Sequence, residues 1–149
     1  MAANRDISGN MRKTTEGFLY SWNGDWIHSA EPNLATRAPE CQHIMMPASV
    51  GASPKSNDDW AEYFKHVAPL ITDSKMTIHD YLAVPEDRRA VCRSSMAATT
   101  PAGPLNNEYV WFLTFDVTGD KIIRIEEFLD SKATTELRIK LREGGYLKH

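Results

Sequence analysis

Hydrophobic and polar positions alternate along the second half of the chain with a period of two, the pattern of β-strands that bury one face. Such runs are present at residues 75–85, 88–99, 108–116 and 121–130. The segments between them are short and contain Pro, Gly and Asp, and Gly119 with Asp120 suits the tight turn of a hairpin. Parallel neighbours need longer crossover connections, so these strands are expected to pair antiparallel.

The first half of the chain and its C-terminal end follow the three- and four-residue spacing of amphipathic helices. The predicted elements there are a helix over 11–27 that Asn23-Gly24 can break, a short helix over 27–35, a strand over 40–47, a helix over 58–71, and a helix over 132–142. Ser56 or Asn57 is expected to cap the third helix, and Gly144-Gly145 to end the last one. Residues 1–10 are small and polar, so they are expected to be loose or to lead into the first helix.

The order of the elements is helices, strand, helix, four strands and helix. It excludes a doubly wound parallel sheet, because the last four strands lack crossover helices. We expect an α+β fold, a cone-shaped, curved antiparallel sheet with N-terminal helices packed over its concave face. Such a cone encloses an apolar pocket with a few polar groups. The 149 residues fit a single domain that can bury a core without metal or disulfide support.

Charge and composition narrow the classes of partner. The net charge is -3, from 17 basic and 20 acidic residues, and no segment concentrates Lys and Arg, so we expect no nucleic-acid partner. Cys41 and Cys92 lie outside any metal-ligand spacing, so we expect buried thiols, or a single disulfide, and no metal site. The chain starts without an apolar signal-peptide core, and no run reaches the ~18 apolar residues of a membrane span. We therefore expect a cytoplasmic protein with no membrane partner.

The last predicted strand carries an acid on an apolar face. Strict alternation puts Glu127 on one face with Ile123 and Ile125, whereas Glu126 shares the opposite face with Arg124. An acid on an apolar face must find a partner, take up a proton or have a chemical task. The pattern predicts a pocket that contains a carboxylate. The alternative is an edge strand whose acids are solvated.

Motifs for nucleotide binding, for a nucleophilic serine on a sharp turn and for a zinc-binding histidine pair are all missing from the sequence. No cofactor is therefore expected, and any chemistry is expected to be acid-base. His43 lies mid-strand, on one face with Cys41 and Met45, where its imidazole can meet Glu127 across a sheet or a pocket. The alternative is a core histidine that bonds only to backbone.

Two arginines lie at the edge of, or within, apolar strand-like runs, where a guanidinium needs an anionic partner. Arg37 and Arg93 are therefore candidates for anchoring an oxyanion, and the alternative is an internal ion pair. Aromatic residues would supply the pocket walls, and Met adapts to irregular apolar ligands. The predicted substrate-binding residues are Met45, Trp60, Tyr63, Arg93, Asn107, Tyr109 and Trp111.

Several features belong together: the order of the elements, the strand RAPECQHIMMPASVG followed by a capped helix, the triplet Asn107-Glu108-Tyr109, and the hairpin GDKIIRIEEFLDS. In these features the chain resembles the SnoaL-like family of the nuclear transport factor 2-like superfamily, over roughly residues 12–142. The similarity is greatest to small fungal proteins of polyketide and meroterpenoid pathways. Members of that group act as cofactor-free isomerases or cyclases.

The resemblance implies a homodimer through the outer face of the sheet and a deep pocket for a hydrophobic small-molecule substrate. The final-strand motif of the family matches Ile125 to Asp130, which places Glu127 where relatives keep a pocket acid. The Arg-x-Asp motif of the family's epoxide hydrolases is absent. The Tyr/Asp pair of its ketosteroid isomerases cannot be aligned, so both activities are disfavoured.

Two functions remain open at this point. In the first, Glu127 with His43 moves a proton at a carbon next to a carbonyl, while Arg37, Asn107 or Tyr63 holds the developing enolate. A carboxylate in an apolar pocket suits this task. In the second, the domain is a non-catalytic binding or dimerisation module whose polar pocket residues only fix a ligand. A buried, paired Glu127 favours the enzyme, and a solvated Glu127 favours the module.

Overall fold

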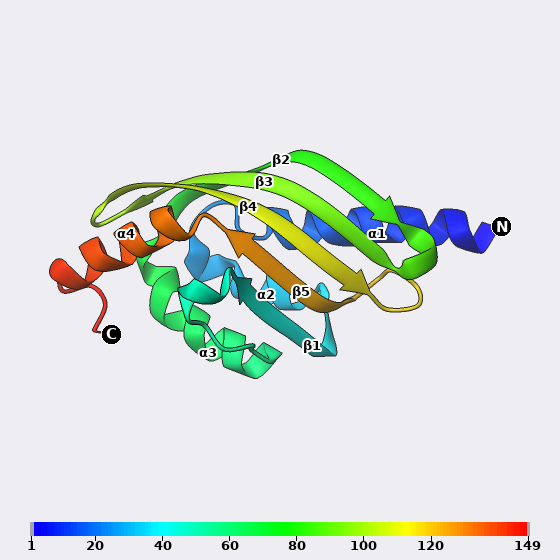
Figure 1. Ribbon diagram of the computed structural model, residues 1–149, viewed down its shortest axis with the longest axis horizontal. Coiled ribbons are helices and arrows are strands. Elements are labelled where there is room, and N and C mark those ends of the chain that lie inside the picture. The colour runs from blue at the N-terminus through cyan, green and yellow to red at the C-terminus, as the bar shows by residue number, and fades with distance from the viewer. Residues whose placement is uncertain (1, 149) are drawn as a thin grey trace.

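The chain folds into one strongly curved five-stranded sheet with helices on its concave side (Figure 1). The computed structural model describes residues 2–148, with side chains from Asp6 onward. The elements are α1 (Ala2–Tyr20), η1 (Trp26–His28), α2 (Ala30–Leu34), β1 (Arg37–Met46), η2 (Ala48–Val50), α3 (Asn57–Val67), η3 (Ala68–Leu70), β2 (Thr72–Val84), η4 (Pro85–Asp87), β3 (Arg89–Thr100), β4 (Gly103–Phe115), β5 (Ile122–Leu129) and α4 (Ser131–Glu143). No helix in the described part of the chain is long and apolar enough to cross a membrane.

The strands lie in the order β1-β5-β4-β3-β2, and the sheet does not close into a barrel. Strands β2 to β5 pair antiparallel, as their short connections predict. Strand β1 instead pairs parallel with β5, so the expectation of an entirely antiparallel sheet is wrong for this strand. The reason is that most of the chain lies between β1 and β5, which is ample length for a crossover. The predicted α+β class and the helix-covered concave face are confirmed.

Several boundaries differ from the prediction. Helix α1 already begins at Ala2, so residues 2–10 belong to a helix, and Met1 lies outside the described residues. The same helix ends at Tyr20, and Gly24 adopts a positive φ of 86° in the turn that follows, where the sequence predicts a break. Strand β4 begins at Gly103, earlier than expected, because a tight turn lets the ladder with β3 continue into a segment of loop composition.

The turn between β4 and β5 is the tight turn that the sequence predicts, and it anchors α1. Gly119 has a φ of 79°, and a Cβ atom on it would lie 2.9 Å from the backbone oxygen of Ile7 and 2.9 Å from the Met11 side chain. Thr14 Oγ1 donates a hydrogen bond to the Gly119 carbonyl at 2.8 Å. The absence of a side chain at this position therefore allows α1 to rest directly on the turn.

Strand β5 contains one extra residue close to its start. Thr114 pairs with Arg124, yet the next residue, Phe115, pairs with Ile122, so Ile123 forms a bulge. Strict alternation predicted Ile123 and Ile125 on the buried face. The bulge instead buries Ile122 and Ile125 completely, and alternation from Ile125 onward is regular.

An aromatic cluster forms the centre of the core beneath the helices. The Trp111 ring stacks on Tyr109 with 5.2 Å between centroids and on Trp22 with 5.3 Å, and it meets Phe18 edge to face at 5.3 Å. The indole Nε1 of Trp111 donates to Ser94 Oγ at 2.8 Å, so its one polar atom is satisfied. Closely packed aromatic rings therefore form part of the concave face of the sheet. Both cysteines, Cys41 and Cys92, are buried free thiols.

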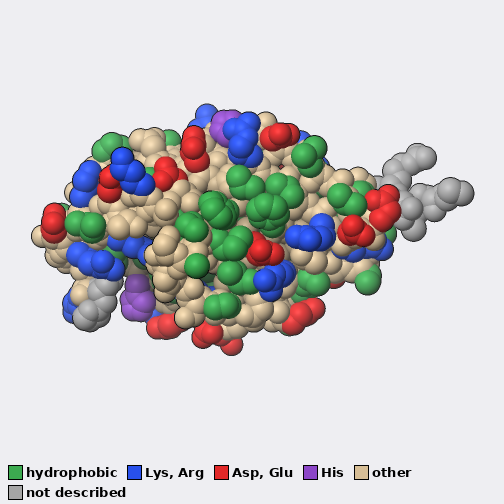
Figure 2. All heavy atoms as spheres, in the orientation of Figure 1, with side chains coloured by type: hydrophobic (Ala, Val, Ile, Leu, Met, Phe, Trp, Pro, Cys, Tyr) green, Lys and Arg blue, Asp and Glu red, His purple; other side chains and the backbone are tan. Residues whose placement is uncertain are grey.

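No helix of the described residues covers the outer face of the sheet. Hydrophobic side chains gather in the middle of this face, over β3, β4 and β5 (Figure 2). Phe128 is 46% exposed and Leu82 is 67% exposed. An apolar sheet face that stays in water is a common site of association between proteins.

Candidate functional site

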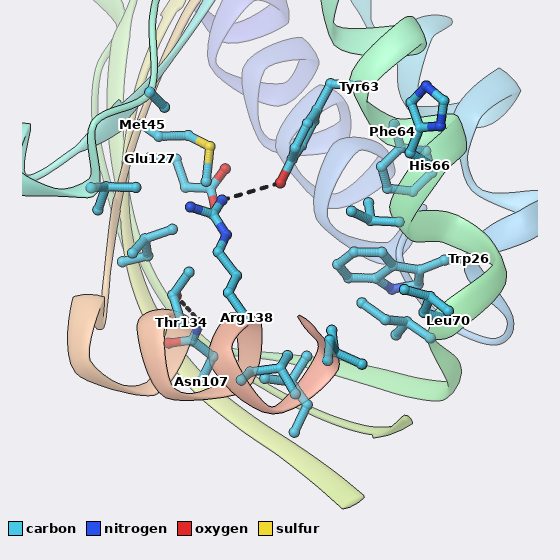
Figure 3. A pocket seen from close by; sticks show the side chains of 18 of the residues that line it. Trp26, Met45, Tyr63, Phe64, His66, Leu70, Asn107, Glu127, Thr134 and Arg138 are labelled. Atoms are coloured by element: carbon cyan, nitrogen blue, oxygen red, sulfur yellow. Dashed lines mark hydrogen bonds between the residues drawn. The ribbon is translucent and has the colours of Figure 1, made fainter. Parts of the chain in front are cut away.

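A cavity of about 830 Å³ lies between the concave face of the sheet and helices α3 and α4 (Figure 3). Its volume is in the range of small-molecule sites in proteins. Six of the predicted substrate-binding residues line it together with the two predicted acid-base residues: Met45, Trp60, Tyr63, Asn107, Tyr109 and Trp111, with His43 and Glu127. The sheet supplies most of these side chains, and α3 supplies Trp60 and Tyr63.

Glu127 lies on an interior strand of the sheet. Its cross-strand neighbours are Met45 of β1 and Trp111 of β4, and its exposed fraction is 9%. The alternative of an edge strand with solvated acids is therefore wrong for Glu127. Its Oε1 atom lies 2.7 Å from His43 Nε2, which is the predicted meeting of the acid and the imidazole.

Behind His43, buried polar side chains form a continuous chain of hydrogen bonds. Arg37 Nη2 lies 3.2 Å from His43 Nδ1. The same guanidinium donates to Asn33 Oδ1 from Nε at 2.9 Å and from Nη2 at 2.6 Å. Asn33 in turn donates from Nδ2 to Ser21 Oγ at 2.9 Å. The acid-base pair is therefore held from behind by groups on α2 and at the end of α1.

These hydrogen bonds determine which nitrogen of His43 carries the proton. Arginine has only donors, so His43 Nδ1 must accept and cannot carry a proton. A neutral imidazole then carries its proton on Nε2, and this N–H donates to Glu127 Oε1. Glu127 Oε1 accordingly accepts that bond.

Electrostatics support the same assignment. Burial lowers the pKa of His43, and the positive charge of Arg37 lowers it further, against the opposing effect of the Glu127 bond. Burial also lowers the pKa of Arg37 to about 10, which leaves the guanidinium charged at neutral pH. The site is therefore a cation, a neutral imidazole and an anion in a row.

The two candidate arginines lie in different places. Arg37 is buried behind His43, with its guanidinium 4.1 Å from the Trp60 ring centroid, and it is not among the residues that line the cavity. We therefore treat Arg37 as a positioning residue. Arg93 is exposed on the outer face, next to a shallow groove, so its predicted contact with a ligand in the cavity is wrong. Its neighbours Cys92 and Ser94 point inward, which turns Arg93 outward by alternation.

Further polar groups stand on the side of the cavity formed by α4. Asn107 Nδ2 donates to Thr134 Oγ1 at 2.9 Å, and Arg138 Nη2 donates to the Tyr63 hydroxyl at 3.3 Å (Figure 3). Burial raises the pKa of Tyr109, so its phenol stays protonated at neutral pH. The cavity thus offers neutral donors in addition to the carboxylate of Glu127.

Three residues of the site were not predicted from the sequence: Asn33, Thr134 and Arg138. The last two lie one turn apart on α4, on the face that also carries the cavity-lining Leu137 and Leu141, so the helical period held that information. Nothing in the sequence around Asn33 indicates its burial. Among the described residues, no group of three or more His, Cys, Asp or Glu side chains could hold a metal ion.

No family model matches the chain. Among curated proteins it is 34% identical to the austinoid biosynthesis cluster protein J of Aspergillus calidoustus over 117 residues, which cover 76% of this chain and 70% of that protein. It is 30% identical to the monooxygenase nsrQ of Aspergillus novofumigatus over 128 residues, covering 86% and 83% of the two chains.

Solved structures share the fold at lower sequence identity. BvnE pinacolase from Penicillium brevicompactum superimposes with a TM-score of 0.85 at 19% identity, over 93% of this chain and 94% of that one. A putative SnoaL-like polyketide cyclase from Jannaschia gives a TM-score of 0.67 at 12% identity, over 85% and 90%. The chain therefore belongs to one family with these two fungal proteins, the austinoid biosynthesis cluster protein J and nsrQ, and it has the nuclear transport factor 2-like fold.

Proposed function

We propose that the protein is a cofactor-independent isomerase or cyclase of fungal polyketide or meroterpenoid biosynthesis. It would move a proton at a carbon next to a carbonyl of a hydrophobic substrate. The observation that carries the proposal is the buried contact of 2.7 Å between Glu127 and His43 at the wall of a large, mainly apolar cavity. The fungal relative in austinoid biosynthesis and the pinacolase of the same fold support this class of chemistry.

Glu127 is the proposed base. Its Oε1 is held by His43, whereas Oε2 has no hydrogen-bond partner among the described residues and is not sealed off from the cavity. Oε2 would take the proton from the substrate carbon, and Glu127 would return it to another atom of the same substrate. His43 stays neutral throughout, because Arg37 occupies Nδ1 and burial disfavours the imidazolium.

The negative charge that develops on the substrate oxygen needs donors. Asn107 and Tyr109 line the cavity on β4, and the raised pKa of Tyr109 keeps its phenol a donor. Tyr63 on α3 is a further donor. Fixed donors of this kind in an apolar site contribute about 3 kcal/mol each to the stabilisation of an oxyanion.

A second candidate is oxygen insertion, because the curated relatives include proteins named monooxygenases. Proton abstraction by Glu127 would give a carbanion in that case too, and the carbanion would react with molecular oxygen to a hydroperoxide. Loss of water from the hydroperoxide would leave a carbonyl, so one oxygen atom stays in the product and the other leaves as water. A third candidate is a domain that binds its ligand without turnover. The mass of the product and the need for oxygen separate these possibilities.

The test is conversion of late polyketide and meroterpenoid intermediates in deuterated water, with and without oxygen. Wild type should give a product of unchanged mass, apart from deuterium, in both atmospheres. Glu127→Gln should slow it by about 10²–10⁴-fold, the usual contribution of a general base, and His43→Ala should slow it as well. Glu126→Gln is the matched control, because this neighbouring acid faces the opposite side and pairs with Arg124.

Three results would count against the isomerase. A product that gains one oxygen atom, and only in air, would assign oxygen insertion. Equal turnover in wild type and Glu127→Gln would remove the proposed base. Tight binding of a panel member without turnover in any variant would assign a binding module.

A further inference from the structure

The charged side chains that line the cavity are distributed unevenly. Lys55, Arg138, Arg142 and Lys148 line it, whereas Glu127 is its only carboxylate among the described residues. The charge of Glu127 is already balanced through His43 by the buried guanidinium of Arg37. The part of the cavity near α4 therefore has an excess of positive charge that no carboxylate of the described lining residues offsets there.

Arg138 is the most constrained of these cations. It is half-buried, it projects from α4 into the cavity, and its guanidinium points toward Tyr63 on α3 (Figure 3). Its one hydrogen bond in the described chain is to the neutral Tyr63 hydroxyl, at 3.3 Å. Lys55 approaches the same tyrosine, with Nζ 5.0 Å from the ring centroid. Two cations thus lie near one side chain that lines the cavity.

Two surface arginines of the fold have carboxylate partners. Arg12 pairs with Glu16 at 2.8 Å and Arg124 with Glu126 at 3.2 Å, although both arginines are on the surface. No carboxylate of the described residues forms an ion pair with Arg138. A partly desolvated guanidinium that lines a cavity and has no carboxylate partner is suited to bind an anion, because its fork of N–H groups matches the two oxygens of a carboxylate.

We propose that the substrate carries an anionic group, such as a carboxylate, and that Arg138 is the residue that binds it. The inference rests on the proposed function, in which this cavity is the substrate site. It also gives the substrate an orientation. The reacting carbon lies at Glu127 and the anionic group lies at Arg138, because the carboxylate of Glu127 would repel a negative group placed next to it. The substrate is an apolar acid, and a fully neutral compound is a poorer ligand.

The test uses two fluorescent probes with the same aromatic skeleton. 1-Anilinonaphthalene-8-sulfonate carries a negative charge, and N-phenyl-1-naphthylamine is its neutral counterpart. In Arg138→Gln, the Kd of the sulfonate should rise by about tenfold or more, the usual value of a hydrogen-bonded charge pair. The Kd of the neutral probe should change by less than about twofold. Arg138→Lys should fall between wild type and Arg138→Gln.

Arg93→Gln is the matched control, because it removes the same charge from the outer face of the sheet. It should leave both Kd values unchanged. An equal loss of affinity for both probes in Arg138→Gln would mean that Arg138 only braces α4 against α3, and would overturn the inference. An unchanged sulfonate Kd, or a cavity that binds neither probe, would overturn it as well.

Failure of the proposed function would give a different pattern. Glu127→Gln removes a negative charge from the cavity, so it should leave sulfonate binding unchanged or tighten it. If Glu127→Gln retained full turnover, the proposed acid-base function would be refuted. The difference between the two probes in Arg138→Gln would still report on the charge of the ligand.

Discussion

Asn33 is the residue that holds the acid-base pair in place without touching the cavity, so its removal gives a sharp test of the buried chain. Asn33 is completely buried, and its Oδ1 accepts two bonds from the Arg37 guanidinium, at 2.9 and 2.6 Å. Asn33→Ala leaves these donors without an acceptor. Arg37 Nη1 already lacks a partner in the described chain, so the guanidinium has no spare bond to use.

The magnitude follows from these contacts. Each hydrogen bond to a charged group contributes about 1.5–3 kcal/mol, and a buried donor without a partner costs a comparable amount. Loss of both bonds predicts a decrease of about 3–5 kcal/mol in the free energy of unfolding. That is a large part of the 5–15 kcal/mol, roughly, that stabilises a typical domain. Asn33→Asp keeps the acceptor and adds a charge opposite Arg37, so it should retain more stability than Asn33→Ala.

The assay is urea unfolding followed by tryptophan fluorescence, with Asn57→Ala as the matched control. Asn57 is half-buried and makes one neutral side-chain bond, from Nδ2 to the Ala38 carbonyl at 2.9 Å, so its loss should cost about 1 kcal/mol. If Asn33→Ala cost no more than Asn57→Ala, the argument that Arg37 depends on Asn33 would be refuted. A structural water that replaces Oδ1 would be the physical reason.

Four further outcomes are expected. The pKa of His43 is lowered in the folded state, so its contribution to stability is full above the ordinary histidine pKa of about 6.5. As pH falls below this value, the free energy of unfolding should decrease by at most ~1.4 kcal/mol per pH unit. Urea midpoints measured from neutral to mildly acidic pH should decrease less in His43→Gln. Trp111→Phe removes the bond to Ser94 and part of a buried ring, so calorimetry should find about 2–3 kcal/mol less stability. Gly119→Ala combines a positive φ with a clash against α1 and should lower the melting temperature by several degrees. If a second copy covers the outer face, as the family resemblance implies, Phe128→Asp should shift sedimentation toward the monomer, and an unchanged mass would place the contact elsewhere.

The acid-base pair could be predicted because both residues lie in strands, where alternation says which way a side chain points. Glu127 and His43 are the polar exceptions on apolar faces, and such exceptions stand out in a sequence. Asn33 was missed because α2 is short and nothing in its sequence marks one polar residue as buried. Arg138 was missed although the helical period places it beside Leu137 and Leu141, because an arginine does not stand out on a helix with many charged residues. Their importance arises only when α2 and α4 are packed against the sheet.

Arg37 and Arg93 show the limit of composition. Both lie in or beside apolar strand-like runs, so the sequence predicts the same role for both. The phase of each strand separates them, since Arg93 follows an inward Cys92 whereas Arg37 opens β1 on the buried side. The parallel pairing of β1 was missed for a related reason. Short connections dictate antiparallel pairing, but a long connection leaves the direction of a strand open.

The bulge at Ile123 means that the two ends of β5 obey different parities. Near the turn, the buried residue is the even-numbered Ile122. Near the site, the buried residues are the odd-numbered Ile125, Glu127 and Leu129. The same residues in a regular strand, without the bulge, would keep Ile122 buried near the turn, but they would present Phe128 to the cavity and Glu127 to the outer face. Within this fold, the gain or loss of one bulge in a strand can therefore create or abolish a cavity acid without a substitution at the site.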